Sequence, residues 1–155
     1  MKELEKLQNI DKRYRIFGMI FLLSTKLETI GNTFLGELTT KQWFLMLILT
    51  NFFETPPTLS ELANKMGTSH QNTKQLAIKL QEKKFLSIQK DEQDNRVLRI
   101  VPTKKIEEYV KTRQYKDYKF IEDFFKVLTK KEIEELDEIL FKLIDNIRNM
   151  EEIRE

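Results

Sequence analysis

The residues of this chain that could do chemistry are few, and they argue against catalysis. The 155 residues include one histidine, His70, and no cysteine. The absence of cysteine excludes disulfides, thiolate metal sites and cysteine nucleophiles. His70 has no second histidine and only distant carboxylates beside it in the sequence. A phosphate or base contact, or no role at all, therefore explains it better than a metal or a proton transfer. We expect no enzyme, no metal and no cofactor.

Paired acids near the C-terminus are the remaining catalytic candidates. They fall on the helix face opposite a row of leucines, where solvated charge is expected. General acid–base chemistry is therefore not inferred from them. These residues are Glu134, Glu135, Asp137 and Glu138.

A polar segment in the middle of the chain is the strongest chemical signal. No Asp or Glu occurs from Ser69 to Gln81, although an ordinary solvated helix face mixes charges of both signs. Gln and Asn side chains suit adenine edges, and Lys reaches guanine or phosphate. A partnerless polar surface helix is the alternative. The candidate DNA-binding residues of this segment are Ser69, His70, Gln71, Asn72, Lys74, Gln75 and Lys79.

The charge distribution agrees with this segment. Residues 58–100 carry eight basic and five acidic side chains, whereas residues 101–155 carry a small negative excess within an overall net charge of +2. A positive middle third is weak evidence for a polyanionic partner, and chance solubility charge explains it equally well.

Length and composition indicate one mostly helical domain over residues 1–155. Apolar residues make up 40% and charged residues 34% of the chain, with only 4 Gly and 3 Pro to interrupt regular elements. The longest apolar runs are too short to span a membrane. The N-terminal segment lacks the pattern of a secretory signal. We expect a cytoplasmic protein without a membrane partner.

The first expected helix, residues 5–30, is apolar on two sides. Three-and-four spacing places each set of apolar residues on one side. A helix with two apolar sides needs two packing partners, and a second copy of the chain could supply one of them. The two sets are Ile10, Tyr14, Phe17 and Phe21, and Ile16, Ile20, Leu23, Leu27 and Ile30.

Capping boxes mark the starts of the following helices. Residues 43–53 follow one of them and must leave the helical conformation before Pro56, and Gly67 supplies a left-handed stop. Thr103 is expected to cap a further helix. The four predicted boxes are Thr39 with Gln42, Thr58 with Glu61, Thr68 with Gln71, and Thr129 with Glu132.

A hairpin follows the polar helix. Residues 85–90 alternate between apolar and polar, residues 91–95 form a turn cluster, and residues 96–101 favour a strand. Two short helices joined by a tight glycine turn and followed by a hairpin form a winged helix. Arg96 lies at the hairpin tip among three acids, where an ion pair to Asp94 or Asp91 could simply shape the turn.

The chain resembles the MarR family of winged-helix transcriptional regulators along its whole length. The resemblance lies in LTTKQWFLMLIL at 38–49, LSELANKMGTSHQNTKQLAIKLQEKKF at 59–85 and DNR at 94–96, with Thr103 seven residues after Arg96. It differs where the family often has glycine, at Lys84 and Ile106, and in lacking an arginine near 88–89.

The resemblance implies a mainly α fold with a small β-hairpin wing. It implies a DNA-binding lobe over 39–103, dimerisation helices at 5–30 and 104–150, and insertion of Arg96 into the minor groove. It also implies a cleft for a small aromatic effector, although ordinary core packing is the favoured explanation of its candidate residues. These are Phe17, Phe21, Trp43, Phe44 and Phe52.

We therefore expect a homodimeric regulator of transcription that binds a pseudo-palindromic operator in double-stranded DNA. A repressor released by a small-molecule effector is the favoured form. The alternative is a winged-helix protein-interaction module that does not bind DNA, which the departures in the wing keep open.

Overall fold

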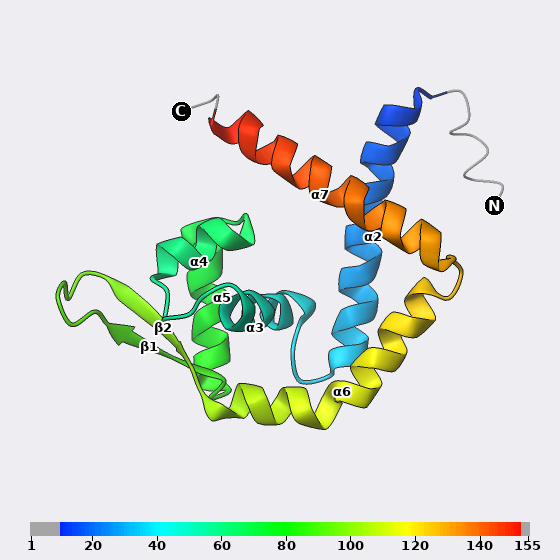
Figure 1. The fold of residues 1–155 in the computed structure, drawn as a ribbon. Helices are drawn as coiled ribbons and strands as arrows, with labels where there is room; N and C mark the ends of the chain where they lie inside the picture. The colour runs from blue at the N-terminus through cyan, green and yellow to red at the C-terminus, as the bar shows by residue number, and fades with distance from the viewer. Residues whose placement is uncertain (1–9, 153–155) are drawn as a thin grey trace. The chain divides into compact units, whose positions relative to one another are not determined.

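The computed structural model describes residues 10–152 and confirms a mainly helical fold with one two-stranded hairpin (Figure 1). The chain divides into two compact units, one ending at Glu107 and the other beginning at Glu108. The elements are α2 (Lys12–Leu35), α3 (Thr40–Asn51), α4 (Leu59–Met66), α5 (His70–Glu82), β1 (Leu86–Lys90), β2 (Leu98–Pro102), α6 (Lys104–Phe125) and α7 (Lys130–Glu152).

The first described helix, α2, is displaced from its predicted range of 5–30. Residues 5–9 lie outside the described part of the chain. Ile10 precedes the helix, because Asp11 is the N-cap and its carboxylate accepts the backbone N–H of Arg13 at 2.8 Å. The helix then continues five residues beyond Ile30 and ends at Leu35.

The end of α2 is held against the start of α3, which explains why the helix continues. Gly31 is buried, and a Cβ atom there would clash with the side chain of Thr40. The Thr40 hydroxyl donates to the carbonyl of Glu28 at 3.1 Å, and its backbone N–H donates to Asn32 Oδ1 at 2.7 Å. The small residue thus lets the two helices approach closely.

Three of the four predicted capping boxes are confirmed, and one is wrong. The boxes at Thr39, Thr58 and Thr129 each satisfy both backbone donors. The box predicted at Thr68 and Gln71 does not form. Ser69, one residue later, caps α5 instead, and its side chain accepts the backbone N–H of Asn72 at 3.2 Å. Each such cap is worth about 1 kcal/mol.

Thr103 precedes α6 as predicted, but its hydroxyl has a different task. It donates to the carbonyls of Lys84 and Phe85, at 2.8 and 2.9 Å, instead of capping the helix. The backbone N–H of Thr103 also donates to the Phe85 carbonyl. Thr103 therefore ties the end of the hairpin to its beginning.

One apolar core joins α3, α4, α5 and the hairpin. Helix α5 packs against α3, α4 and β1. The strands pair antiparallel, with Ile88 opposite Ile100. The innermost side chains of this core are Leu45, Leu59, Leu62, Ala77, Leu80, Phe85, Leu86 and Ile100.

The second unit comprises the rest of α6 and α7. The C-terminal acids are exposed on α7, where Lys130 pairs with Glu134 and Lys131 with Glu135 across one helical turn. The predicted leucine face of α7 is also exposed in the single chain. Between residues 10 and 152 no helix is long and apolar enough to cross a membrane, and no cluster of side chains could hold a metal ion.

Lys84 occupies a backbone conformation that favours glycine. Its φ angle is +64°, in the left-handed region, and it connects α5 to β1. A Cβ atom in this region costs roughly 1–2 kcal/mol. The resemblance noted in the sequence leads one to expect glycine at this position, and Lys84 adopts the backbone conformation that a glycine would take.

Substitution of Lys84 by glycine should relieve this strain. We expect Lys84→Gly to be more stable than Lys84→Ala by about 1 kcal/mol, because both variants lose the lysine side chain and only alanine keeps the Cβ atom. Thermal or urea unfolding of the two variants measures the difference. Equal stabilities would show that the turn carries no strain at this residue.

Candidate nucleic-acid interface

The buried face of α5 determines which side chains the helix exposes. Thr73, Ala77 and Leu80 are fully buried. The Thr73 hydroxyl donates to the carbonyl of Ser69 at 3.1 Å, so even this polar group faces inward with a partner. Rotation of α5 about its axis would expose these residues, and the opposite face is therefore fixed outward.

The outward face is the one predicted from the sequence. All seven predicted residues of this segment are exposed. Apart from the Ser69 cap, their side chains make no hydrogen bond or ion pair with any other residue that the structure describes. Polar side chains that fold without partners are available to a ligand. We call this set, Ser69, His70, Gln71, Asn72, Lys74, Gln75 and Lys79, the α5 polar face.

The position of the N-cap changes two roles within this face. Ser69 already uses its side-chain oxygen to accept the N–H of Asn72. Gln71, predicted to form a capping box with Thr68, is instead released from the cap. Helix α5 therefore begins one residue later than the predicted cap implies, at His70, while the residues of the α5 polar face are unchanged.

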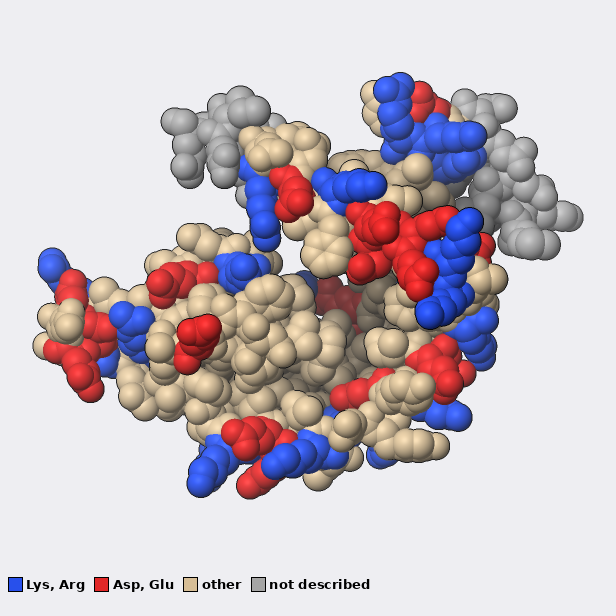
Figure 2. Space-filling view, viewed as in Figure 1, with Lys and Arg blue, Asp and Glu red and all other residues tan. Residues whose placement is uncertain are grey.

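The wing turn presents Arg96 to solvent. Its side chain is 92% exposed and pairs with Asp94, whose Oδ1 accepts the Arg96 backbone N–H at 2.9 Å and Nε at 3.2 Å. Of the two predicted ion-pair partners, Asp94 is confirmed and Asp91 is wrong. Figure 2 shows acidic and basic side chains side by side on the part of the surface formed by the wing.

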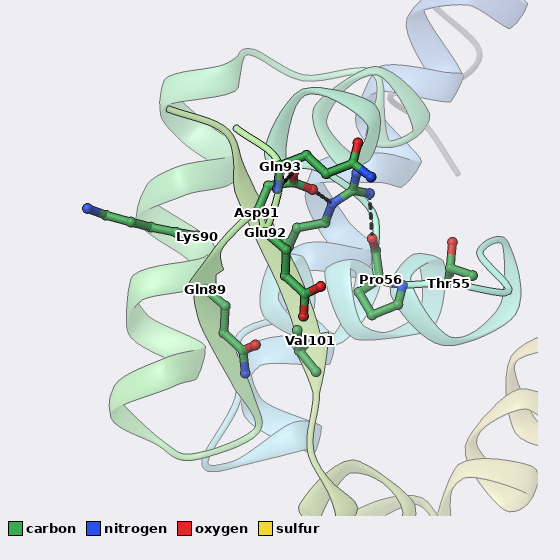
Figure 3. Close-up of a pocket in the computed structure, with 9 residues that line it drawn as sticks. Thr55, Pro56, Gln89, Lys90, Asp91, Glu92, Gln93 and Val101 are labelled. Carbon is green, nitrogen blue, oxygen red and sulfur yellow. Dashed lines mark hydrogen bonds and ion pairs between the residues drawn. The ribbon is translucent and has the colours of Figure 1, made fainter. Parts of the chain in front are cut away.

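Asp91 pairs instead with Arg99, a residue that the sequence analysis did not single out. Arg99 Nε donates to Asp91 Oδ2 at 2.6 Å, and Nη1 donates to the carbonyl of Pro56 at 3.0 Å (Figure 3). No local pattern in the sequence indicates this role, because its partners lie eight and forty-three positions away. Arg99 lies opposite Gln89, close to where the resemblance leads one to expect an arginine on the other strand.

A shallow pocket of about 430 Å³ lies beside this pair, between the hairpin and the loop that precedes α4 (Figure 3). Arg99 and Asp91 line this pocket together with Thr55 and Pro56 of the loop. The other lining residues belong to the hairpin and are Gln89, Lys90, Glu92, Gln93 and Val101. Lys90 belongs to the rim but points away from the other labelled residues. The pocket therefore lies where the wing meets the loop before α4.

The pKa of Asp91 is lowered from 3.8 to about 2. The hydrogen bond from the Arg99 side chain is the largest cause, followed by the backbone N–H groups of Gln93 and Asp94, which donate to the same carboxylate. All three favour the ionised form. Asp91 is thus charged throughout the physiological range and organises the wing turn.

The five aromatic residues predicted for an effector cleft are not core residues of the single chain. Phe17 and Phe21 on α2 are 64% and 62% exposed, and their rings contact each other edge to face with ring centroids 5.0 Å apart. Phe44 and Phe52 are also exposed, and Trp43 is half-buried. None of the five lines the pocket beside Arg99. The cleft stays a prediction.

Comparison with known proteins supports the fold at low sequence identity. No protein-family model matches the chain, and no curated protein matches it. Among solved structures, MarR has a TM-score of 0.78 against this chain at 17% sequence identity, and the match covers 92% of this chain and 95% of that chain.

Two further structures carry ligands. The S. aureus MepR–DNA complex has a TM-score of 0.72 at 18% identity, covering 83% of this chain and 95% of that chain. PcaV from Streptomyces coelicolor, solved with its natural ligand, has a TM-score of 0.71 at 16% identity, covering 90% and 96%. The chain therefore has the winged-helix fold of MarR-type transcriptional regulators.

Titration of Asp91 should be visible in acid. Its folded-state pKa is below the ordinary value, so its contribution to stability is fully present above about pH 4 and is lost as the pH falls through about 2. We expect the difference in melting temperature between wild type and Asp91→Asn to be constant from neutral pH down to that range, and then to shrink. Thermal unfolding across this range measures it. A difference that does not change with pH would contradict the assignment.

Proposed function

We propose that this protein is a homodimeric transcriptional regulator that binds double-stranded DNA through the α5 polar face and the wing. The observation that carries the proposal is the set of exposed, unpartnered and acid-free polar side chains on α5. The second helix of a helix-turn-helix enters the major groove with its N-terminal part. The likeness to MepR, which was solved bound to DNA, supports the same use of the fold.

The two parts of the surface have different tasks in this proposal. On α5, Asn72, Gln75 and Lys74 can hydrogen-bond base edges, and Lys79 can neutralise phosphate. On the wing, Arg96 reaches the adjacent minor groove, whose narrow A·T-rich stretches attract arginine. Sequence preference then comes mainly from α5, and the wing adds affinity.

The dimer would pair two such surfaces. Large apolar side chains on α2, α6 and α7 are exposed in the single chain, and apolar areas of this extent mark protein interfaces. A two-fold axis would present two copies of α5 to successive major grooves, so the operator would be a pseudo-palindrome.

The regulatory form that we propose is a cytoplasmic repressor released by a small aromatic effector. PcaV, which shares the fold, was solved with a natural ligand. The exposed aromatic residues of α2 and α3, with Phe52 at the end of α3, supply surface on which an aromatic ring could stack.

A protein-interaction module without DNA binding is the second candidate. The wing tip carries Asp91, Glu92 and Asp94 close to the single Arg96, and acidic groups oppose the approach of phosphate. Asp91 and Asp94 are, however, neutralised by Arg99 and Arg96. This pairing favours the DNA-binding function.

Dimerisation should be detectable without DNA. Burial of a Leu or Phe side chain is worth roughly 1.5–3 kcal/mol, so several such residues per subunit should give a stable dimer at micromolar concentration. We expect light scattering to give twice the chain mass of 18.7 kDa. Leu23→Glu on α2 should yield monomers, whereas Lys26→Glu on the same helix should not. A monomeric wild type would refute the dimer.

Loss of Gln75 and loss of Arg96 should affect DNA binding differently. Gln75→Ala removes a base contact worth about 1–3 kcal/mol of discrimination. It should flatten preference at one or two operator positions and leave the salt dependence nearly unchanged. Arg96→Ala should lower affinity about tenfold or more, roughly 1.4 kcal/mol, and keep the operator preference.

The measurement uses a duplex selected by the wild type from a random pool and a scrambled duplex of the same composition. Both variants are titrated against both duplexes at two salt concentrations. Wild-type affinity in Arg96→Ala would show that its ion pair only shapes the turn and that the wing does not contact DNA.

A further inference from the structure

Besides its packing against α5, the wing is joined to the loop before α4 along the outer edge of β2. The backbone N–H of Ile100 donates to the carbonyl of Pro57 at 2.9 Å, and Arg99 forms an isolated antiparallel bridge with Thr58. Thr58 is the N-cap of α4. The second wing strand is therefore hydrogen-bonded directly to the segment that begins the helix-turn-helix.

The side chain of Arg99 reinforces this attachment and extends it to the tip. Its guanidinium group joins the Pro56 carbonyl, in the loop before α4, to the Asp91 carboxylate, at the end of β1. The two donors act in different directions, which a planar guanidinium allows and a lysine ammonium on a flexible stem does not reproduce. We call this arrangement the Arg99 clamp.

A continuous chain of hydrogen bonds leads from the clamp to Arg96. Asp91 Oδ1 accepts the backbone N–H groups of Gln93 and Asp94 at 2.9 and 3.1 Å. Asp94 in turn accepts the backbone N–H and Nε of Arg96. Each carboxylate thus shapes the segment that carries the next residue, and the chain ends at the exposed arginine.

Burial separates the clamp from an ordinary surface ion pair. Arg96 is 92% and Asp94 45% exposed, whereas Arg99 is 38% and Asp91 only 15% exposed. Isolated exposed pairs contribute little, and pairs held by several hydrogen bonds in a network are the exception. The structure-forming pair is therefore Arg99–Asp91, and Arg96–Asp94 depends on it.

We propose that the Arg99 clamp is a positioning device for DNA binding, which fixes the wing relative to the helix-turn-helix so that Arg96 is presented at a set distance from α5. Arg99 acts through Arg96 and does not itself contact DNA. This inference rests on the proposed function, but its mechanical part concerns the protein alone.

The mechanical part is tested without DNA. Because the chain has no cysteine, Ser60→Cys on α4 and Asn95→Cys in the wing turn provide two unique sites for spin labels. Labelled protein diluted into unlabelled protein gives the distance distribution within one chain. In the protein that carries only the two cysteine substitutions, we expect a narrow distribution of distances between the labels. Addition of Arg99→Gln or Asp91→Asn should make this distribution clearly broader.

Two further variants sharpen this measurement. Arg99→Lys keeps the charge but should broaden the distribution as Arg99→Gln does, since it cannot hold both acceptors in the same geometry. Arg148→Gln removes another arginine–aspartate pair, on α7, and should leave the distribution narrow. A narrow distribution in both Arg99→Gln and Asp91→Asn would overturn the proposal.

The DNA arm tests whether the clamp acts through Arg96. Affinity for the wild-type-selected duplex is measured for Arg99→Gln, Arg96→Ala and the double variant. We expect each single variant to bind about tenfold more weakly, and the double variant to lose no more than about twofold beyond Arg96→Ala, because residues in one network are not additive.

Additive losses, with one unit less of salt dependence in Arg99→Gln, would show that Arg99 contacts phosphate directly and would overturn the proposal. Failure of the wild type to bind any duplex would refute the proposed function itself. In that case the label distances would still decide whether Arg99 holds the wing.

Discussion

The burial of Thr73, Ala77 and Leu80 against α3, α4 and β1 is the constraint on which the rest of the interface depends. These residues leave α5 one stable rotation, and that rotation directs the α5 polar face outward. The inward hydrogen bond of Thr73 to Ser69 strengthens this choice, because exposure of the buried face would also break it. Availability of the polar side chains is therefore a consequence of core packing and not of their own interactions.

The wing is less buried than α5, but its orientation also depends on contacts with the core. A two-stranded hairpin alone is marginally stable, and the tip of this one carries three acids. The structure compensates by placing Ile100 in the core and by joining Arg99 to both Pro56 and Asp91. Asp91 and Asp94 thereby become internal acceptors that shape the turn, and the Arg96 side chain remains exposed. An acidic tip and a DNA-binding role are compatible because two of the acids already have cationic partners.

Local signals accounted for most of the fold that could be predicted from the sequence. Capping boxes at Thr39, Thr58 and Thr129, the left-handed Gly67 and the alternation in the hairpin each depend on neighbouring residues only. Predictions that required a contact distant in sequence were less successful. The Thr103 hydroxyl bonds residues nineteen and eighteen positions away, and Arg99 bonds Pro56 across forty-three. Nothing local to either residue indicates such a partner. The site residues on α5 could be predicted because exposure on a helix follows from periodicity, whereas their contacts with DNA cannot follow from one chain alone.

The most direct test of the central claim is the salt dependence of duplex binding by the wild-type protein. We predict that the logarithm of its association constant falls linearly with the logarithm of salt concentration, as release of counterions requires. We further predict that a duplex selected from a random pool is pseudo-palindromic and binds about a thousandfold or more tightly than a scrambled one. Weak binding that is insensitive to salt, with no preference between the two duplexes, would contradict the claim that α5 and the wing form a DNA-binding surface.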